Sequence, residues 1–190
     1  ARRAIACMLA MKQAMAELGQ KWAKEGQEPF VIRGGVQSGE VVAGNVGLQG
    51  KKMEYTVIGD TVNQAARLEG TAKYYGVQFL VGESTYLQTC DTYRYRELDK
   101  VRVVGKQVPV TIYELCGTRS EPEGELVGHF NAALALFRAR QWDEAERSFA
   151  TIINEITDDR PSRIYMERCE HFRNAPPAEG WDGVSNRRDK

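Results

Sequence analysis

Asn63 and Arg67 lie four residues apart, in a segment that runs from a strand-like pattern into a helix-like pattern. Residues at this spacing share one face of a helix, so the amide and the guanidinium are expected to project together. An amide can fix a sugar oxygen, and a guanidinium donates a charged fork to phosphate. The pair therefore suits a ligand that carries both groups, although either residue alone is more simply read as an exposed polar side chain.

The elements that position this pair follow from the local pattern. In the strand expected at 53–58, Met53, Tyr55 and Val57 point one way and Glu54, Thr56 and Ile58 the other, because strand side chains alternate. The next helix is expected to take Asp60 or Thr61 as its cap and to end near Gly76.

Further elements alternate along the first 116 residues. The pattern predicts a helix from Ile5 to Trp22 that buries one face and stops at Gly26 and Pro29. The remaining expectations are strands at 30–36, 40–46, 78–81 and 93–98, a tight connection at 37–39, a helical turn at 83–87, and a hairpin of 100–104 with 108–115. This alternation predicts an α/β or α+β fold, with a sheet covered by helices.

Composition excludes several classes of protein. The chain has 190 residues, 42% of them hydrophobic, and its 26 Lys and Arg balance 26 Asp and Glu, so no overall field favours nucleic acid. No apolar run reaches the roughly 20 residues of a membrane span, and no signal peptide is evident, so we expect a cytoplasmic segment without direct membrane contact. The four cysteines are scattered and are expected to be reduced thiols.

Two segments together carry a family resemblance: Arg33-Gly-Gly-Val-Gln-Ser-Gly-Glu-Val-Val-Ala-Gly-Asn-Val-Gly47 and Glu54-Tyr-Thr-Val-Ile-Gly-Asp-Thr-Val-Asn-Gln-Ala-Ala-Arg-Leu-Glu69. They resemble the second half of a class III nucleotidyl cyclase catalytic domain, closest to the adenylyl cyclases. The resemblance covers residues 1–116 and implies a partial ferredoxin-like sheet with flanking helices. It also implies that the intact parent converts ATP to 3′,5′-cyclic AMP and pyrophosphate for intracellular signalling.

The resemblance assigns roles to five residues. Asn63 matches the asparagine that orients the ribose, and Arg67 matches the arginine that stabilises the transition-state phosphate. Thr56 matches the position that reads the purine, and the carbonyl of Val57 is expected to contact the base as well. Lys106 matches a lysine that meets the terminal phosphates.

The resemblance further implies two divalent ions, Mg²⁺ or Mn²⁺, and a head-to-tail homodimer in which a second subunit completes the ATP site. The family's metal-binding aspartates precede the helix with which this chain begins, and nothing in residues 1–29 matches them. The chain opens without Met in the middle of a helical pattern, so we expect a fragment that is inactive alone. The intact parent is expected to be active, and segments outside this chain can anchor it to a membrane.

Two other readings stay open. The parent could be a guanylate cyclase, although that class usually has cysteine at the position of Thr56, or the chain could be a non-catalytic dimerisation or regulatory module. The Gly34–Gly47 glycines match neither a Walker nor a Rossmann phosphate loop and are expected at turns and close contacts. His129 and His171 have no paired ligand cluster and are expected to have capping or surface roles rather than metal or acid–base roles.

The last third of the chain is predicted to be helical. Residues 117–124 form a candidate linker, and 125–190 a tail with one tetratricopeptide-like hairpin, which should pack on the first part or on a second chain. A third helix is expected to begin at Pro161. The stretch 174–181 is expected to be an extended strap anchored by Trp181, and 187–190 to be loose.

Overall fold

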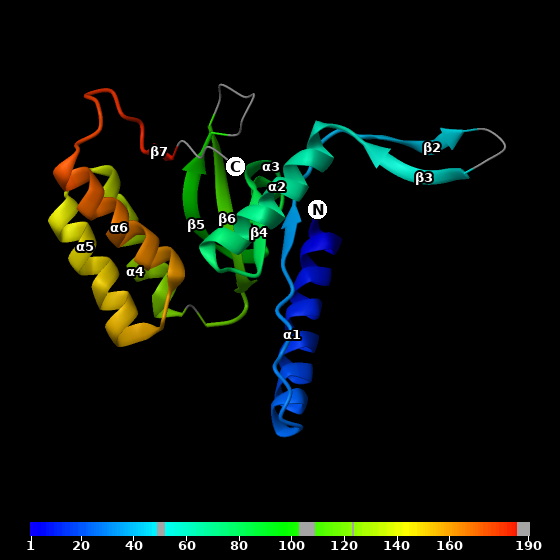
Figure 1. Ribbon diagram of the computed structural model, residues 1–190, viewed down its shortest axis with the longest axis horizontal. Helices are drawn as coiled ribbons and strands as arrows, with labels where there is room; N and C mark the ends of the chain where they lie inside the picture. The colour runs from blue at the N-terminus through cyan, green and yellow to red at the C-terminus, as the bar shows by residue number, and fades with distance from the viewer. Residues whose placement is uncertain (49–51, 103–108, 123, 186–190) are drawn as a thin grey trace.

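The computed structural model describes residues 1–48, 52–102, 109–122 and 124–185 (Figure 1). It has the mixed α+β architecture expected from the sequence, with one five-stranded sheet, a separate two-stranded sheet and six α-helices in the described ranges. Lys106 and the expected turn at 105–107 lie outside the described residues, as does the end at 187–190. No helix in the described part combines the length and apolar character that a bilayer crossing requires.

The five-stranded sheet has the order β1-β4-β6-β5-β7. Its strands are β1 (Gly34–Val36), β4 (Phe79–Gly82), β5 (Tyr93–Val101), β6 (Val110–Thr118) and β7 (Val184–Ser185). The central pairs β4–β6 and β5–β6 are antiparallel, and the outer pairs β1–β4 and β5–β7 are parallel. The prediction of two separate strands at 93–98 and 100–104 is wrong, because β5 runs without a break through Asp99.

One face of this sheet carries α2 (Asp60–Tyr75). Gly35 of β1 allows the close approach, since a Cβ there would lie only 2.3 Å from the carbonyl oxygen of Ala65. The helix ends at Gly76 in the left-handed conformation, as expected. The expected cap is wrong: Gly59 occupies the N-cap without a side-chain bond, and the Thr61 hydroxyl instead donates to the Glu40 carbonyl at 3.0 Å.

The opposite face carries α1 (Arg2–Lys24) and the short α3 (Glu83–Leu87). The ends of α1 match the expectation, but its apolar face is largely uncovered in this chain. Ile5 is buried against Phe79 and its neighbours, whereas Met11 is 45% and Leu18 is 40% exposed. Periodicity thus identified the helix correctly, but this chain buries only its first turns.

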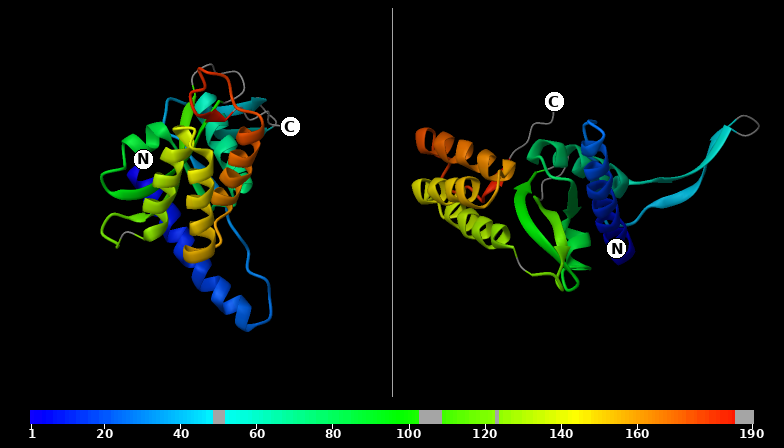
Figure 2. Two further views of the ribbon diagram at one scale, coloured as in Figure 1. Left: turned by 90° about the vertical axis from the view of Figure 1, so that its left-hand side faces the viewer. Right: turned by 90° about the horizontal axis from the view of Figure 1, so that it is seen from below.

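β2 (Val42–Leu48) and β3 (Lys52–Ile58) pair antiparallel as expected, with Gly44 opposite Thr56. They form their own two-stranded sheet, which we call the arm, and it projects away from the rest of the molecule (Figures 1 and 2). The segment 37–41 therefore links two different sheets rather than closing a tight turn between neighbouring strands.

The tail forms three α-helices: α4 (Glu125–Arg138), α5 (Trp142–Thr151) and α6 (Arg160–Asn174). A π-helical segment, Ile152–Ile156, extends α5. The expected packing on the first part of the chain is confirmed, because Phe130 and Tyr165 of the tail share one hydrophobic cluster with Leu98 and Ile112 of the sheet. The same cluster includes apolar residues of α2, and the tail lies at the β5 side of the sheet (Figures 1 and 2). The boundary at 117–124 stays a prediction.

A buried ion network fixes the start of α6. Asp159 is the N-cap, with Pro161 in the first turn, and its carboxylate accepts from the backbone N–H of Ser162 at 3.0 Å. Arg96 of β5 reaches Asp159 at 2.9 Å and Glu114 at 2.8 Å. Burial alone lowers the pKa of Arg96, but the two carboxylates outweigh it and raise that pKa.

The expected strap is also present. Trp181 is partly buried, and its ring lies 5.6 Å from Phe137, 5.7 Å from Trp142 and 5.2 Å from Phe172, centroid to centroid. Beyond Trp181 the chain returns to the sheet as β7, beside the end of β5. The strap thus joins the outer end of the tail to the sheet.

Candidate functional site

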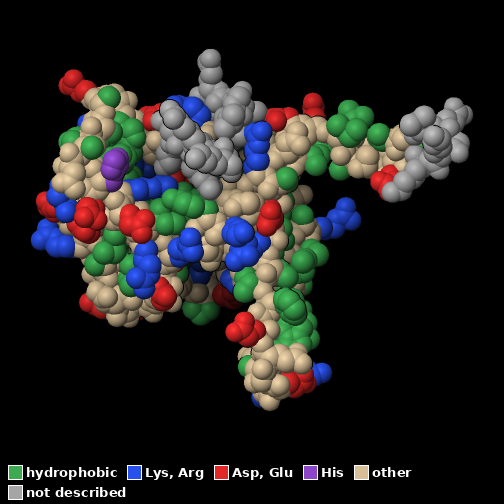
Figure 3. All heavy atoms as spheres, in the orientation of Figure 1, with side chains coloured by type: hydrophobic (Ala, Val, Ile, Leu, Met, Phe, Trp, Pro, Cys, Tyr) green, Lys and Arg blue, Asp and Glu red, His purple; other side chains and the backbone are tan. Residues whose placement is uncertain are grey.

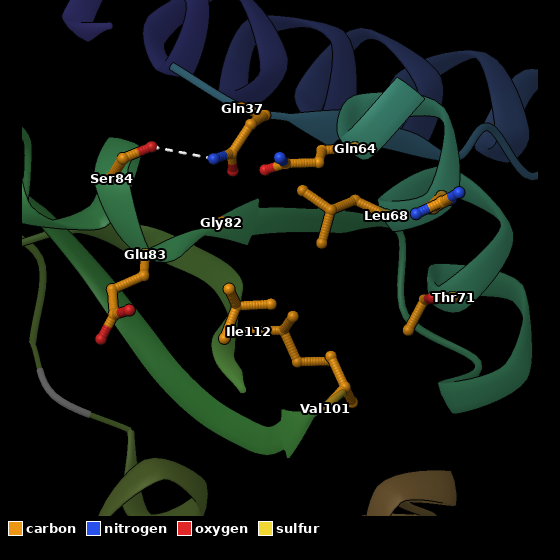
Figure 4. Close-up of a pocket in the computed structure, with 11 residues that line it drawn as sticks. Gln37, Gln64, Leu68, Thr71, Gly82, Glu83, Ser84, Val101 and Ile112 are labelled. Atoms are coloured by element: carbon orange, nitrogen blue, oxygen red, sulfur yellow. Dashed lines mark hydrogen bonds between the residues drawn. The ribbon is translucent and has the colours of Figure 1, made fainter. Parts of the chain in front are cut away.

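A cavity of about 170 Å³ lies between α2 and the sheet (Figure 4). Arg67 and Gln64 line it from α2, Gln37 from the segment after β1, and Glu83 and Ser84 from the start of α3. Its apolar wall consists of Leu68, Val101, Val110 and Ile112. Amide, hydroxyl and guanidinium groups over an apolar wall suit a polar ligand with an anionic part.

Hydrogen bonds fix the position of Gln37 in this cavity. Its side-chain amide donates to the Ser84 hydroxyl at 2.9 Å, and that hydroxyl donates to the Ser38 carbonyl at 2.6 Å (Figure 4). The Gln37 side chain lies directly over Gly82, where an added Cβ would be 1.6 Å from the Gln37 oxygen. Glycine at this position therefore leaves the space that the amide occupies.

Asn63 and Arg67 are both exposed and lie one turn apart on α2. The structure brings Arg67 to the cavity together with Gln37, Gln64 and Ser84. Asn63 does not line the cavity, and it sits closer to the N-terminus of the helix, toward the arm. Since neither side chain is buried, the face that carries them is accessible to a ligand or to a second polypeptide.

Thr56 and Val57 lie on β3 of the arm, and both are exposed. They do not line the cavity, so within this chain Thr56 and Arg67 are not joined in one enclosed site. The arm also exposes large apolar side chains: Val42 and Tyr55 are each 74% exposed, and Ile58 is 54% exposed. Figure 3 shows hydrophobic side chains along this arm.

The described residues contain no group of three or more His, Cys, Asp or Glu side chains arranged to hold a metal ion. Asp60 instead accepts a hydrogen bond from Gln64 at 2.7 Å within α2. The described residues therefore do not fit the divalent ions that the resemblance implies. All four cysteines are free thiols, and burial raises the pKa of Cys116 and of Cys169 to about 12.

Several cavity residues were not found from the sequence. Gln37, Gln64 and Ser84 come from three separate elements, and the family resemblance gives none of them a role. The sequence predicts a turn at Gln37 and Ser38, because polar residues next to glycine are typical of turns. Only the packing of α2 on β1 and β4 brings them together, because α3 begins directly where β4 ends.

Comparison with known proteins assigns the first part of the chain to a family. The adenylate and guanylate cyclase catalytic domain family matches residues 1–117. Adenylate cyclase 1 of Rhizobium meliloti is 33% identical over 117 residues, which are 62% of this chain and 17% of that protein. The adenylate cyclase of Anabaena cylindrica is 35% identical over 119 residues, covering 59% of this chain and 24% of that protein. The chain thus spans less than a quarter of either relative.

Two solved structures share the fold. The adenylyl cyclase CyaB from P. aeruginosa superposes with a TM-score of 0.51 at 32% identity, over 60% of this chain and 58% of that one. The guanylyl cyclase Cya2 superposes with a TM-score of 0.53 at 28% identity, over 61% of this chain and 57% of that one. With the family match spanning residues 1–117, the chain belongs to the adenylate and guanylate cyclase catalytic domain family.

Proposed function

We propose that this chain is the base- and phosphate-binding part of an adenylate cyclase, which converts ATP to 3′,5′-cyclic AMP and pyrophosphate. The observation that carries the proposal is the exposed pair Asn63 and Arg67, presented by one helix that packs closely on β1. In the reaction the ribose 3′-oxygen forms a bond to the α-phosphorus, the bond from that phosphorus to the β-bridging oxygen breaks, and the hydroxyl proton passes to an acceptor.

Each proposed residue has a distinct task. Asn63 orients the ribose, and Arg67 stabilises the negative charge that builds on the α-phosphate oxygens. Thr56 reads the adenine edge through its hydroxyl, beside the carbonyl of Val57. Lys106, which lies outside the described residues, is proposed to meet the terminal phosphates.

A second subunit is part of the proposal. A cavity of about 170 Å³ is smaller than the roughly 300–1,000 Å³ of typical small-molecule sites, so a nucleotide needs additional walls. Two features support a head-to-tail homodimer that supplies them: the exposed face of α2 and the apolar arm that carries Thr56. Since the described residues do not fit a metal, the ligands for Mg²⁺ or Mn²⁺ are proposed to come from polypeptide outside this chain, and this chain alone is proposed to be inactive.

The guanylate cyclase reading is the second candidate, favoured by the similarity to Cya2. The threonine at position 56 and the adenylate cyclase relatives favour ATP. Comparing kcat/KM for ATP and GTP on the assembled enzyme decides between them. The third reading, a non-catalytic cyclase-like module, predicts no turnover of either nucleotide.

Arg67→Ala tests the proposed site in the enzyme assembled with the metal-binding polypeptide. We expect kcat to fall roughly 100- to 1,000-fold with a much smaller change in KM, because the contact strengthens as charge develops in the transition state. Lys73→Ala is the matched control, since it removes an exposed cation from the last turn of the same helix. An Arg67→Ala enzyme with the turnover of the Lys73→Ala enzyme would remove Arg67 from the mechanism.

A further inference from the structure

The far end of α2 is bound to the tail through three polar side chains. The Tyr75 hydroxyl, in the last turn of α2, donates to the Asp99 carboxylate of β5 at 2.5 Å. Arg168 of α6 donates to the same carboxylate oxygen at 2.8 Å and to the Tyr75 oxygen at 3.1 Å. A helix, a strand and the tail therefore meet at one closed triangle of hydrogen bonds.

These groups are taken out of water. Tyr75 is fully buried, Asp99 is 1% exposed, and the Arg168 side chain is 17% exposed. The other Asp99 oxygen accepts from the backbone N–H of Lys100 at 2.7 Å, so both carboxylate oxygens are satisfied. Burial, followed by the negative charge of Asp99, raises the pKa of Tyr75. A satisfied buried network of this kind holds its members in one arrangement.

The tail touches the candidate site region at further points. The Tyr165 hydroxyl of α6 donates to the Leu98 carbonyl of β5 at 2.7 Å. At Gly76, which ends α2, an added Cβ would lie 2.7 Å from the side chain of Arg160. The strap returns as β7 and pairs with Val101, which itself lines the Arg67 cavity. The tail thus supports both α2 and the strand beside it.

We propose that Tyr75, Asp99 and Arg168 are positioning residues that hold α2 so that Asn63 and Arg67 meet the substrate, and that the helical tail is therefore part of the catalytic unit. This inference rests on the proposed function of α2. Tyr75 lies eight residues from Arg67 on the same helix, a distance of about 12 Å along its axis. Because the helix moves as one piece, loosening its end at Tyr75 displaces the Arg67 guanidinium. A small displacement of a catalytic group lowers the reaction rate many-fold.

The test uses two readouts. The first is hydrogen exchange of the α2 amides in this full chain, and the second is kcat and KM in the assembled cyclase. Tyr75→Phe removes only the hydroxyl, and Arg168→Gln removes the charged fork. For both variants we expect α2 exchange to quicken about ten-fold and kcat to fall about ten-fold, with KM changed less than about two-fold. Arg168→Lys keeps the charge, so its α2 exchange rate and its kcat should lie between those of Arg168→Gln and wild type.

Arg138→Gln is the matched control, because Arg138 joins the tail to Glu97 of β5 without contacting α2. It should leave α2 exchange and kcat close to wild type. If Tyr75→Phe and Arg168→Gln behave like this control, the network only tethers the tail and the inference is overturned. If the assembled wild-type enzyme makes no cyclic nucleotide, the proposed function fails, whereas the exchange measurement still decides whether the tail holds α2.

Discussion

Arg96 and Asp159 form a buried ion pair at 2.9 Å that joins the sheet to the first turn of α6. Their side chains are 2% and 6% exposed. Removing the cation leaves two carboxylates, Asp159 and Glu114, without their buried partner. We therefore expect Arg96→Ala to lower the free energy of unfolding by about 3–5 kcal/mol, as measured by denaturant titration.

The exposed pair of Arg163 with Asp158 provides the comparison for that variant. Arg163→Ala should cost less than about 1 kcal/mol, because solvent screens such pairs. Equal losses for the two variants would show that burial of the Arg96 network contributes nothing to stability.

The close packing of α2 on β1 leads to a prediction about two glycines. Gly35→Ala would place a Cβ 2.3 Å from the Ala65 carbonyl oxygen and 2.6 Å from the Leu68 Cβ, so α2 must shift. We expect a loss of about 1–3 kcal/mol in unfolding free energy. Gly70→Ala, on the open side of the same helix, meets nothing within 4 Å and should stabilise by about 0.5–1 kcal/mol. A Gly35→Ala chain as stable as wild type would contradict this close packing.

Thr56 gives a prediction about nucleotide choice. Thr56→Val keeps the shape of the side chain and removes the hydroxyl proposed to meet adenine. Losing one hydrogen bond of about 1 kcal/mol should lower kcat/KM for ATP roughly five-fold in the assembled enzyme. Thr151→Val removes a hydroxyl from the tail, where it bonds to the Arg147 carbonyl, and should leave kcat/KM unchanged. Unchanged ATP kinetics in Thr56→Val would mean that the hydroxyl does not read the base.

Two tyrosines, the buried Tyr95 and the half-buried Tyr113, make the fold sensitive to alkali. Burial raises the pKa of Tyr95 and of Tyr113 from 10.0 to about 12. A folded-state pKa above the unfolded value favours the neutral phenol, so its stabilisation is complete below pH 10 and is lost as the pH rises toward 12. The unfolding midpoint should fall across this window, and tyrosinate absorbance should show a late phase. In a Tyr95→Phe and Tyr113→Phe double variant the fall should be shallower.

Much of the fold could be predicted because the pattern of the chain agrees with it locally. Apolar residues at three- and four-residue intervals located α1 and the tail helices, and Gly76 marked the end of α2. The break expected at Asp99 is wrong because a charged residue inside a strand reads as exposed, whereas here Tyr75 and Arg168 satisfy it. A local pattern contains no information about partners 24 and 69 residues away.

The candidate site could likewise be predicted only in part. The relation of Asn63 to Arg67 could be predicted because one helix determines it, and both side chains are exposed. Their roles at a site stay a prediction. Gln37 and Ser84 could not be predicted, because their neighbourhood depends on how three elements pack. Their hydrogen bond joins residues 47 positions apart in the chain.

The arm has a consequence for handling the protein. Two strands alone are marginally stable in water, and each strand of the arm has its outer edge unpaired within the described residues. An apolar ribbon with open edges recruits other strands, so concentrated chains that lack a partner should tend to precipitate or form fibrils. The solubility of this polypeptide should therefore depend on whether the apolar arm is covered.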